Sequence, residues 1–91
     1  MLFVWIGFLK EEGAAVSQEV QMQVTDFLQQ PYIAINSGGA LLDESSRRRG
    51  MLMIFEVEDR SSAEALVRES PYLQAGLYET HHLFEYRNEV G

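Results

Sequence analysis

Two adjacent histidines, His81 and His82, are the side chains of this sequence best suited to proton transfer. An unperturbed imidazole changes charge between about pH 5 and 8, so it can act as a general acid or base near neutral pH. The surrounding residues 78–87 read as a β-strand, and neighbouring side chains on a strand point to opposite faces of its sheet. The two imidazoles therefore cannot bind one metal ion from one face, and at most one of them reaches a given cleft.

His81 shares its predicted strand face with two carboxylates, Glu79 and Glu85, whereas Tyr78 is predicted on the face of His82. A carboxylate that accepts a hydrogen bond from an imidazole holds the ring in one tautomer and makes it a better base. The pattern thus predicts an oriented general base at His81. The alternative is an edge-strand histidine in a solvated mixture of charges.

Four further residues are candidates for substrate binding because they lie near two predicted turns: Asp43, Arg68, Ser70 and Tyr72. Ser70 precedes Pro71, a pattern that predicts a side-chain N-cap followed by proline at the first helical position, and the unpaired N–H groups of a first helical turn can bind an anion. The competing interpretation is structural, with Tyr72 as a packing residue and Arg68 as a surface charge.

Two motifs of the second quarter of the chain are predicted to be turns. The pair Gly38–Gly39 lacks the spacing of dinucleotide-binding and Walker motifs, so a flexible turn explains it. The three arginines at residues 47–49 lie beside Asp43 and Glu44, which indicates a solvated loop tip rather than a polyanion site. A third group of apolar residues at strand spacing predicts either a ligand pocket or core and interface packing; its members are Trp5, Met51, Met53 and Phe55.

Composition excludes several functional classes. The chain has 91 residues, a length typical of one domain, with 14 acidic and 7 basic residues and a formal net charge of −7. This charge disfavours nucleic acid and anionic membrane partners. The chain contains no cysteine, which excludes a thiolate nucleophile and cysteine-ligated metals. No targeting segment or span of roughly 20 apolar residues is evident, so we expect a single domain over residues 1–91 in the cytoplasm, without a metal or cofactor.

Hydrophobic periodicity predicts the order β-α-β-β-α-β. The predicted strands cover residues 2–9, 32–37, 51–57 and 78–87; the predicted helices cover residues 16–30 and a segment that begins at Ser61, followed by a short turn over residues 70–76. This order is typical of a ferredoxin-like α+β fold, an antiparallel sheet whose right-handed crossovers bring both helices to one face. Residues 2–9 are apolar at both sets of alternate positions. The helix-free face must therefore be covered, by a second copy of the chain, an apolar ligand or both.

The sequence resembles the YciI-like (YCII-related) family over essentially its whole length. Gly50 leads an apolar strand that ends at Glu56, residues 62–65 read Ser-Ala-Glu-Ala, and residues 71–78 carry the distinctive pattern Pro-Tyr-x-x-Ala-Gly-x-Tyr. Residues 37–41 with Asp43 look like the family's Gly-Pro turn. The resemblance implies a dimeric α+β barrel, a homodimer through the helix-free sheet face, with a cleft between sheet and helices.

The resemblance also implies small-molecule chemistry by a histidine and a carboxylate. Family members often carry a histidine on the first helix and an aspartate before the Pro-Tyr pair, whereas residues 16–30 here contain no histidine and residue 70 is serine. The leading hypothesis is a cofactor-independent lyase, isomerase or hydrolase in which His81 or His82 transfers a proton. The alternative is a non-catalytic module for small-molecule binding or assembly, which both departures favour.

Overall fold

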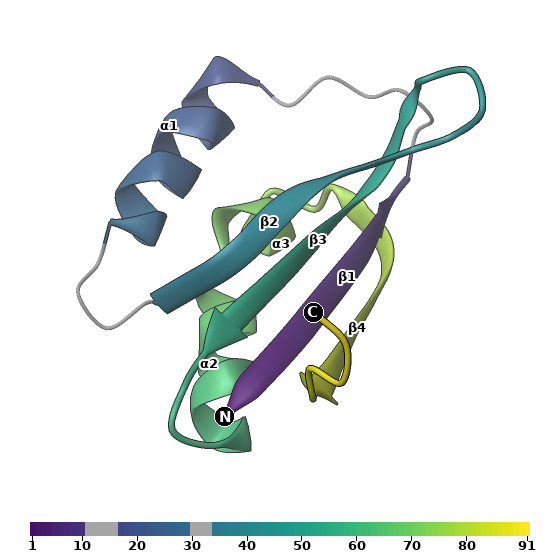
Figure 1. The fold of residues 1–91 in the computed structure, drawn as a ribbon. Helices are drawn as coiled ribbons and strands as arrows, with labels where there is room; N and C mark the ends of the chain where they lie inside the picture. The colour runs from purple at the N-terminus through teal and green to yellow at the C-terminus, as the bar shows by residue number, and fades with distance from the viewer. Residues whose placement is uncertain (11–16, 30–33) are drawn as a thin grey trace.

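The computed structural model describes residues 1–10, 17–29 and 34–91 (Figure 1). Its elements are β1 (Leu2–Leu9), α1 (Gln18–Leu28), β2 (Ala34–Leu42), β3 (Arg48–Glu56), α2 (Arg60–Glu69), α3 (Pro71–Gln74) and β4 (Tyr78–Tyr86). The strands form one sheet in the order β2-β3-β1-β4, and each neighbouring pair is antiparallel. The predicted ferredoxin-like α+β fold is confirmed. None of the helices in the described ranges is long and apolar enough to cross a membrane.

The hydrophobic core lies between the sheet and the helices, because alternate residues of the central strands point to that side. Phe3 of β1 and Phe55 of β3 are fully buried, and their rings stack at a centroid distance of 6.3 Å. Three side chains of α2 complete this core: Ala63, Leu66 and Val67. Trp5 belongs to the same buried face.

The opposite sheet face is apolar and uncovered in the single chain. The other alternate positions of β1 include Val4, which is half-buried, and Phe8, which is 42% exposed. Across the β1–β4 pair, Val4 lies opposite Phe84, which is 54% exposed. The sequence expectation of a strand that is apolar on both faces is therefore confirmed, with helices covering one face only.

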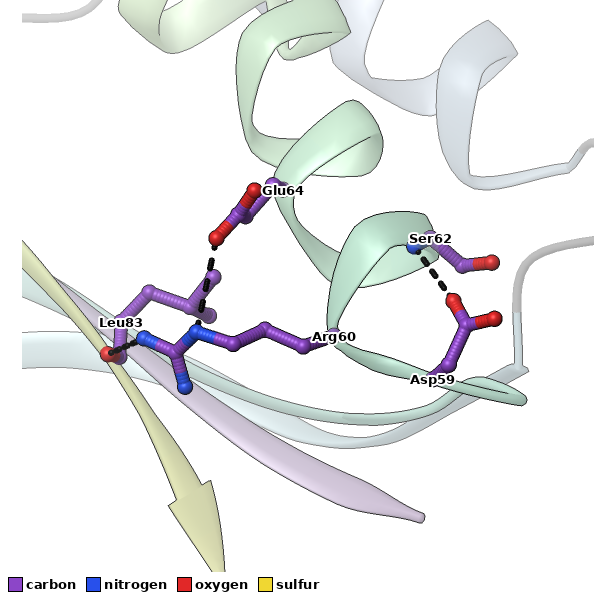
Figure 2. A network of polar contacts seen from close by, with 5 residues as sticks. All are labelled: Asp59, Arg60, Ser62, Glu64 and Leu83. Carbon is purple, nitrogen blue, oxygen red and sulfur yellow. Dashed lines mark hydrogen bonds and ion pairs between the residues drawn. The ribbon is translucent and has the colours of Figure 1, made fainter.

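Local side-chain bonds explain where α1 and α2 begin. Ser17 caps α1, because its Oγ accepts a hydrogen bond from the Val20 N–H at 3.2 Å. Asp59 caps α2 in the same way through Ser62, at 2.8 Å (Figure 2). The predicted helix start at Ser61 is wrong. The N-cap residue is Asp59, because its backbone is extended and its carboxylate accepts a hydrogen bond from the first turn of a helix that begins at Arg60.

The turn after α2 has the predicted backbone conformation but lacks the predicted side-chain cap. Ser70 occupies the N-cap position of α3, Pro71 comes first in the helix, and Gly76 has a φ of +69°. The Ser70 side chain, however, makes no capping hydrogen bond, so the predicted side-chain cap is wrong.

The other predicted boundaries differ in detail. Gly38–Gly39 lies within β2, which continues to Leu42, so the predicted turn there is wrong. Strand pairing with β3 decides this, since both glycines have register partners, Met53 and Leu52. The predicted first helix and second strand include residues 16, 30, 32 and 33, which lie outside the described residues.

Candidate functional site

A cleft of about 320 Å³ lies between the helix-covered face of the sheet and the helices α1 and α3. We call it the helix–sheet cleft. Its apolar wall includes Trp5, Val24, Phe27, Met51 and Met53, and its polar side chains are Arg48, Ser70, Tyr72 and Tyr78. Concave, mostly apolar sites with a few polar groups are typical of small-molecule binding. The sequence left open whether four strand-spaced apolar residues line a ligand pocket or pack in the core or an interface. Trp5, Met51 and Met53 line this pocket, whereas Phe55 packs in the core.

Irregularities in strand pairing direct two of the polar residues into this cleft. The β1–β4 register skips Glu79, so that Leu9 pairs with Tyr78, and the β2–β3 register skips Arg49, so that Leu42 pairs with Arg48. Beyond a residue that the register skips, the side chains of the strand point to the face opposite to the one that strict alternation predicts. As a result, Tyr78 and Arg48 face the helices.

This placement corrects two sequence predictions. Strand alternation predicts Tyr78 on the face of His82, yet its ring packs with Trp5 on the helix-covered face, at a ring-centroid distance of 5.4 Å in an edge-on arrangement. The charge pattern predicts a solvated loop tip for the arginines at residues 47–49. Arg47 and Arg49 are exposed, but Arg48 begins β3 and is half-buried in the cleft.

Tyr78 presents a hydroxyl that remains protonated. Burial raises the pKa of Tyr78 above its ordinary value; the neighbouring Tyr72 raises it further, and the positive charge of Arg48 opposes the shift. The ring lies 6.3 Å from that of Tyr72. At neutral pH the Tyr78 hydroxyl is therefore a hydrogen-bond donor beside the cleft.

Ser70 adds a second polar group to the wall of the cleft. The residue is only 2% exposed, and its hydroxyl is not used to cap α3. The structure thus brings Ser70 and Tyr72 together in the cleft, whereas Arg68 and Asp43 do not line it.

His81 makes an interaction that the sequence does not indicate. Its Nδ1 accepts a hydrogen bond from Trp5 Nε1 at 3.1 Å, and the two rings are edge-on at 5.9 Å. Since an indole nitrogen can only donate, a neutral His81 carries its proton on Nε2. Among the described residues, neither Glu79 nor Glu85 pairs with His81, so the predicted oriented general base is not formed by those carboxylates.

The two histidines border a second cavity of about 450 Å³ between α2 and β4, which we call the edge cavity. His81 lies on the helix-covered face, whereas His82 stacks on Phe84 at 6.1 Å, so the predicted opposite orientations are confirmed. Both rings nevertheless line this one cavity, so the prediction that at most one of them reaches a given cleft is wrong; β4 is an edge strand, and both of its faces are accessible there. Arg68 also lines it.

Arg60 joins α2 to the edge strand beside this cavity. Its guanidinium donates to the Leu83 carbonyl at 3.3 Å and pairs with Glu64 at 3.4 Å (Figure 2). The ion pair is largely exposed, so its main effect is to position the side chains at the cavity wall.

Asp43 lines neither cavity. Its carboxylate accepts hydrogen bonds from the N–H groups of Ser45 and Arg47, at 2.8 and 3.0 Å, and thereby shapes the turn between β2 and β3. The six predicted site residues therefore divide among three places: Ser70 and Tyr72 in the helix–sheet cleft, Arg68, His81 and His82 at the edge cavity, and Asp43 in a turn. Sequence reasoning missed Arg48 and Tyr78.

Metal binding has no evident site in the part of the chain that the structure describes, where no three histidine or carboxylate side chains gather suitably. The apolar wall, the tyrosine and serine hydroxyls and Arg48 instead suit an organic ligand in the helix–sheet cleft.

Comparisons with known proteins agree with this architecture. The structure of 5-chloro-2-hydroxyhydroquinone dehydrochlorinase from Burkholderia phenoliruptrix AC1100, in complex with 2,5-dihydroxybenzoquinone, matches with a TM-score of 0.71. The match covers 98% of this chain and 96% of that chain at 18% sequence identity, so it shows a shared fold. No curated protein matches the sequence. Residues 1–87 match the YCII-related domain, and the chain therefore belongs to the YCII-related family.

Proposed function

We propose that this protein binds a small, flat ring molecule with oxygen substituents in the helix–sheet cleft. The observation that carries the proposal is the presence of four aromatic rings, those of Trp5, Phe27, Tyr72 and Tyr78, in the wall that also presents Ser70 and Arg48. Rings stack on rings, and hydroxyl and guanidinium donors orient oxygen acceptors.

The size and chemistry of the cleft support a ligand of this class. A volume of about 320 Å³ is near the lower end of ligand pockets, which suits one or two rings. An aromatic contact with Trp5 or Tyr78 would add about 0.5–1.5 kcal/mol beyond the burial of apolar area. The fold relative from Burkholderia phenoliruptrix was solved with 2,5-dihydroxybenzoquinone, itself a flat ring with oxygen substituents.

Binding of 2,5-dihydroxybenzoquinone, monitored by NMR and by thermal shift, tests the proposal. We expect the ligand to raise the melting temperature and to shift the signals of cleft residues such as Trp5 and Gly38. Tyr78→Phe should weaken binding, because it removes a donor while keeping the ring. Tyr86→Phe, on the same strand but outside the cleft, is the matched control. If Trp5 and Gly38 do not respond to any oxygen-substituted ring, the proposal is wrong.

A second candidate function is catalysis at the edge cavity, as a cofactor-independent lyase, isomerase or hydrolase. The supporting observation is that His81, His82 and Arg68 line one cavity. The hydrogen bond from Trp5 leaves the proton of neutral His81 on Nε2, so this ring would donate a hydrogen bond to polarise a substrate oxygen, with Arg68 to orient an anionic substrate.

Two variants separate the candidates. His81→Gln should abolish turnover and leave ring binding in the helix–sheet cleft intact if the edge cavity is catalytic. Turnover that survives in His81→Gln but is lost in Tyr78→Phe would place any chemistry in the cleft instead.

We also propose that the helix-free sheet face is the interface of a homodimer. The exposed rings of Phe8 and Phe84 on this face support it, since a single chain in water gains by burying them. Light scattering at micromolar concentration should give twice the chain mass, and Phe84→Glu should give a folded monomer, because a buried unpaired charge at the interface costs several kcal/mol. A monomeric wild-type protein would contradict the dimer.

A further inference from the structure

The polar groups in the helix–sheet cleft are donors, and one of them carries a full positive charge. Arg48 brings five N–H donors to the cleft, and the buried hydroxyls of Ser70 and Tyr78 are each able to donate. Among the described residues that line the cleft there is no aspartate or glutamate. The wall therefore lacks a negative group to balance Arg48.

The position of Arg48 is specific to the fold rather than to a flexible arginine-rich turn. The β2–β3 register skips Arg49, and this irregularity directs Arg48 to the helix-covered face while its two arginine neighbours stay exposed. Bulges are frequent beside functional sites because they redirect one side chain. The first residue of a regular strand also holds its side chain more firmly than a loop would.

Arg48 is also close enough to act on the deeper part of the cleft. Its charge favours the ionised form of the Tyr78 hydroxyl, against the effects of burial and of Tyr72. Among the described residues Arg48 makes no ion pair, so within this part of the chain its half-buried charge has no counter-charge. An anionic ligand would supply that counter-charge in a site of low dielectric constant.

We propose that Arg48 selects an anionic ring ligand, with a carboxylate or phenolate oxygen bound to its guanidinium and the ring between the aromatic walls of the cleft. This inference rests on the proposed function. It adds that the ligand is negatively charged and that Arg48 recognises this charge. The net charge of −7 repels anions at long range, so the selectivity must come from this local contact.

Benzoate and benzamide provide a direct test, because they share ring and shape and differ in charge. NMR titrations should shift the signals of Trp5 and Gly38 with both probes, and benzoate should bind at least about tenfold more tightly than benzamide. Arg48→Gln should remove this preference, so that the two probes bind with similar affinity. Added salt should weaken benzoate binding only.

Two further variants control for folding and for net charge. Arg48→Lys keeps the charge and should keep most of the preference for benzoate over benzamide. If Arg48→Gln does not fold, this preference is measured in Arg48→Lys instead. Arg49→Gln removes the same charge from an exposed neighbour and should keep the preference in full.

The outcomes distinguish this inference from the proposed function. If benzamide binds in the cleft as tightly as benzoate, or Arg48→Gln keeps the preference, the role of Arg48 is overturned while ring binding stands. If benzoate shifts only signals of the edge cavity, or neither probe shifts the signals of Trp5 and Gly38, ring binding in the cleft fails and the inference fails with it.

Discussion

The ring of Tyr78 occupies the space above Gly7 that any side chain at residue 7 would need. A Cβ atom built on Gly7 would lie 2.6 Å from Tyr78 Cζ, closer than real Cβ contacts allow. A glycine inside an apolar strand often marks such a close approach. Gly7 thus lets the Tyr78 ring lie against the sheet and contact Trp5.

Gly7→Ala should therefore move the Tyr78 ring and weaken ring binding in the helix–sheet cleft. Overpacking of this kind typically lowers the free energy of unfolding by about 1–3 kcal/mol. Urea unfolding and the NMR titration with 2,5-dihydroxybenzoquinone measure both effects. Gly39→Ala is the matched control for stability, since nothing lies within 4 Å of its Cβ position. Unchanged stability and unchanged binding in Gly7→Ala would show that the ring is not required there.

Trp5 should report its hydrogen bond to His81. The chain has a single tryptophan, so its indole N–H signal in NMR spectra is unambiguous. Loss of the Nδ1 acceptor breaks the hydrogen bond from Trp5, and the indole proton resonance should then lie upfield of its wild-type position. His81→Ala should cause this shift and His82→Ala should not. The reverse assignment would contradict the Trp5–His81 bond.

Gly76→Val should destabilise the fold by at least about 1 kcal/mol. Gly76 has a φ of +69°, which a β-branched residue adopts only with strain. Crowding is a small factor, since the nearest atom to its Cβ position is Lys10 Nζ at 3.9 Å. Urea denaturation of this variant beside Gly39→Val isolates the conformational effect, because Gly39 lies in a strand with open space. Equal stability of the two variants would argue against it.

The cap of α2 should give the protein an acid-sensitive contribution to stability. Hydrogen bonds from the backbone and side chain of Ser62 hold the pKa of Asp59 below its ordinary value, and slight desolvation opposes them. A folded-state pKa below the unfolded value means that the carboxylate stabilises the fold above the ordinary aspartate pKa, and that this contribution disappears as the pH falls through the lowered value.

Asp59→Ala should accordingly be less stable than the wild type at pH 7, and the difference should narrow as the pH falls below the ordinary aspartate pKa of 3.8. Urea unfolding of both proteins at several pH values measures it. Glu58→Ala, a neighbouring exposed carboxylate outside the cap, should show a smaller effect. A stability difference that grows as the pH falls would contradict a lowered pKa of Asp59 in the folded protein.

The topology of this protein could be predicted from its residue pattern. Period-two patterns and helix signals are local, and right-handed crossovers leave one arrangement for the order β-α-β-β-α-β, so the sheet and its single helix-covered face could be predicted. The same local signals placed Ser70, Pro71 and Gly76 correctly along the backbone. The opposite orientations of His81 and His82 followed from strand alternation alone.

The polar residues that line the cleft could not be predicted in this way, because their placement depends on how the strands pair. Tyr78 and Arg48 reach it because the strand registers skip Glu79 and Arg49, and those irregularities depend on pairing with β1 and β2. The Trp5–His81 hydrogen bond joins residues 76 apart in sequence. Register and cross-strand contacts are set by the energy of the whole sheet packed against its helices, which no local pattern of residues contains.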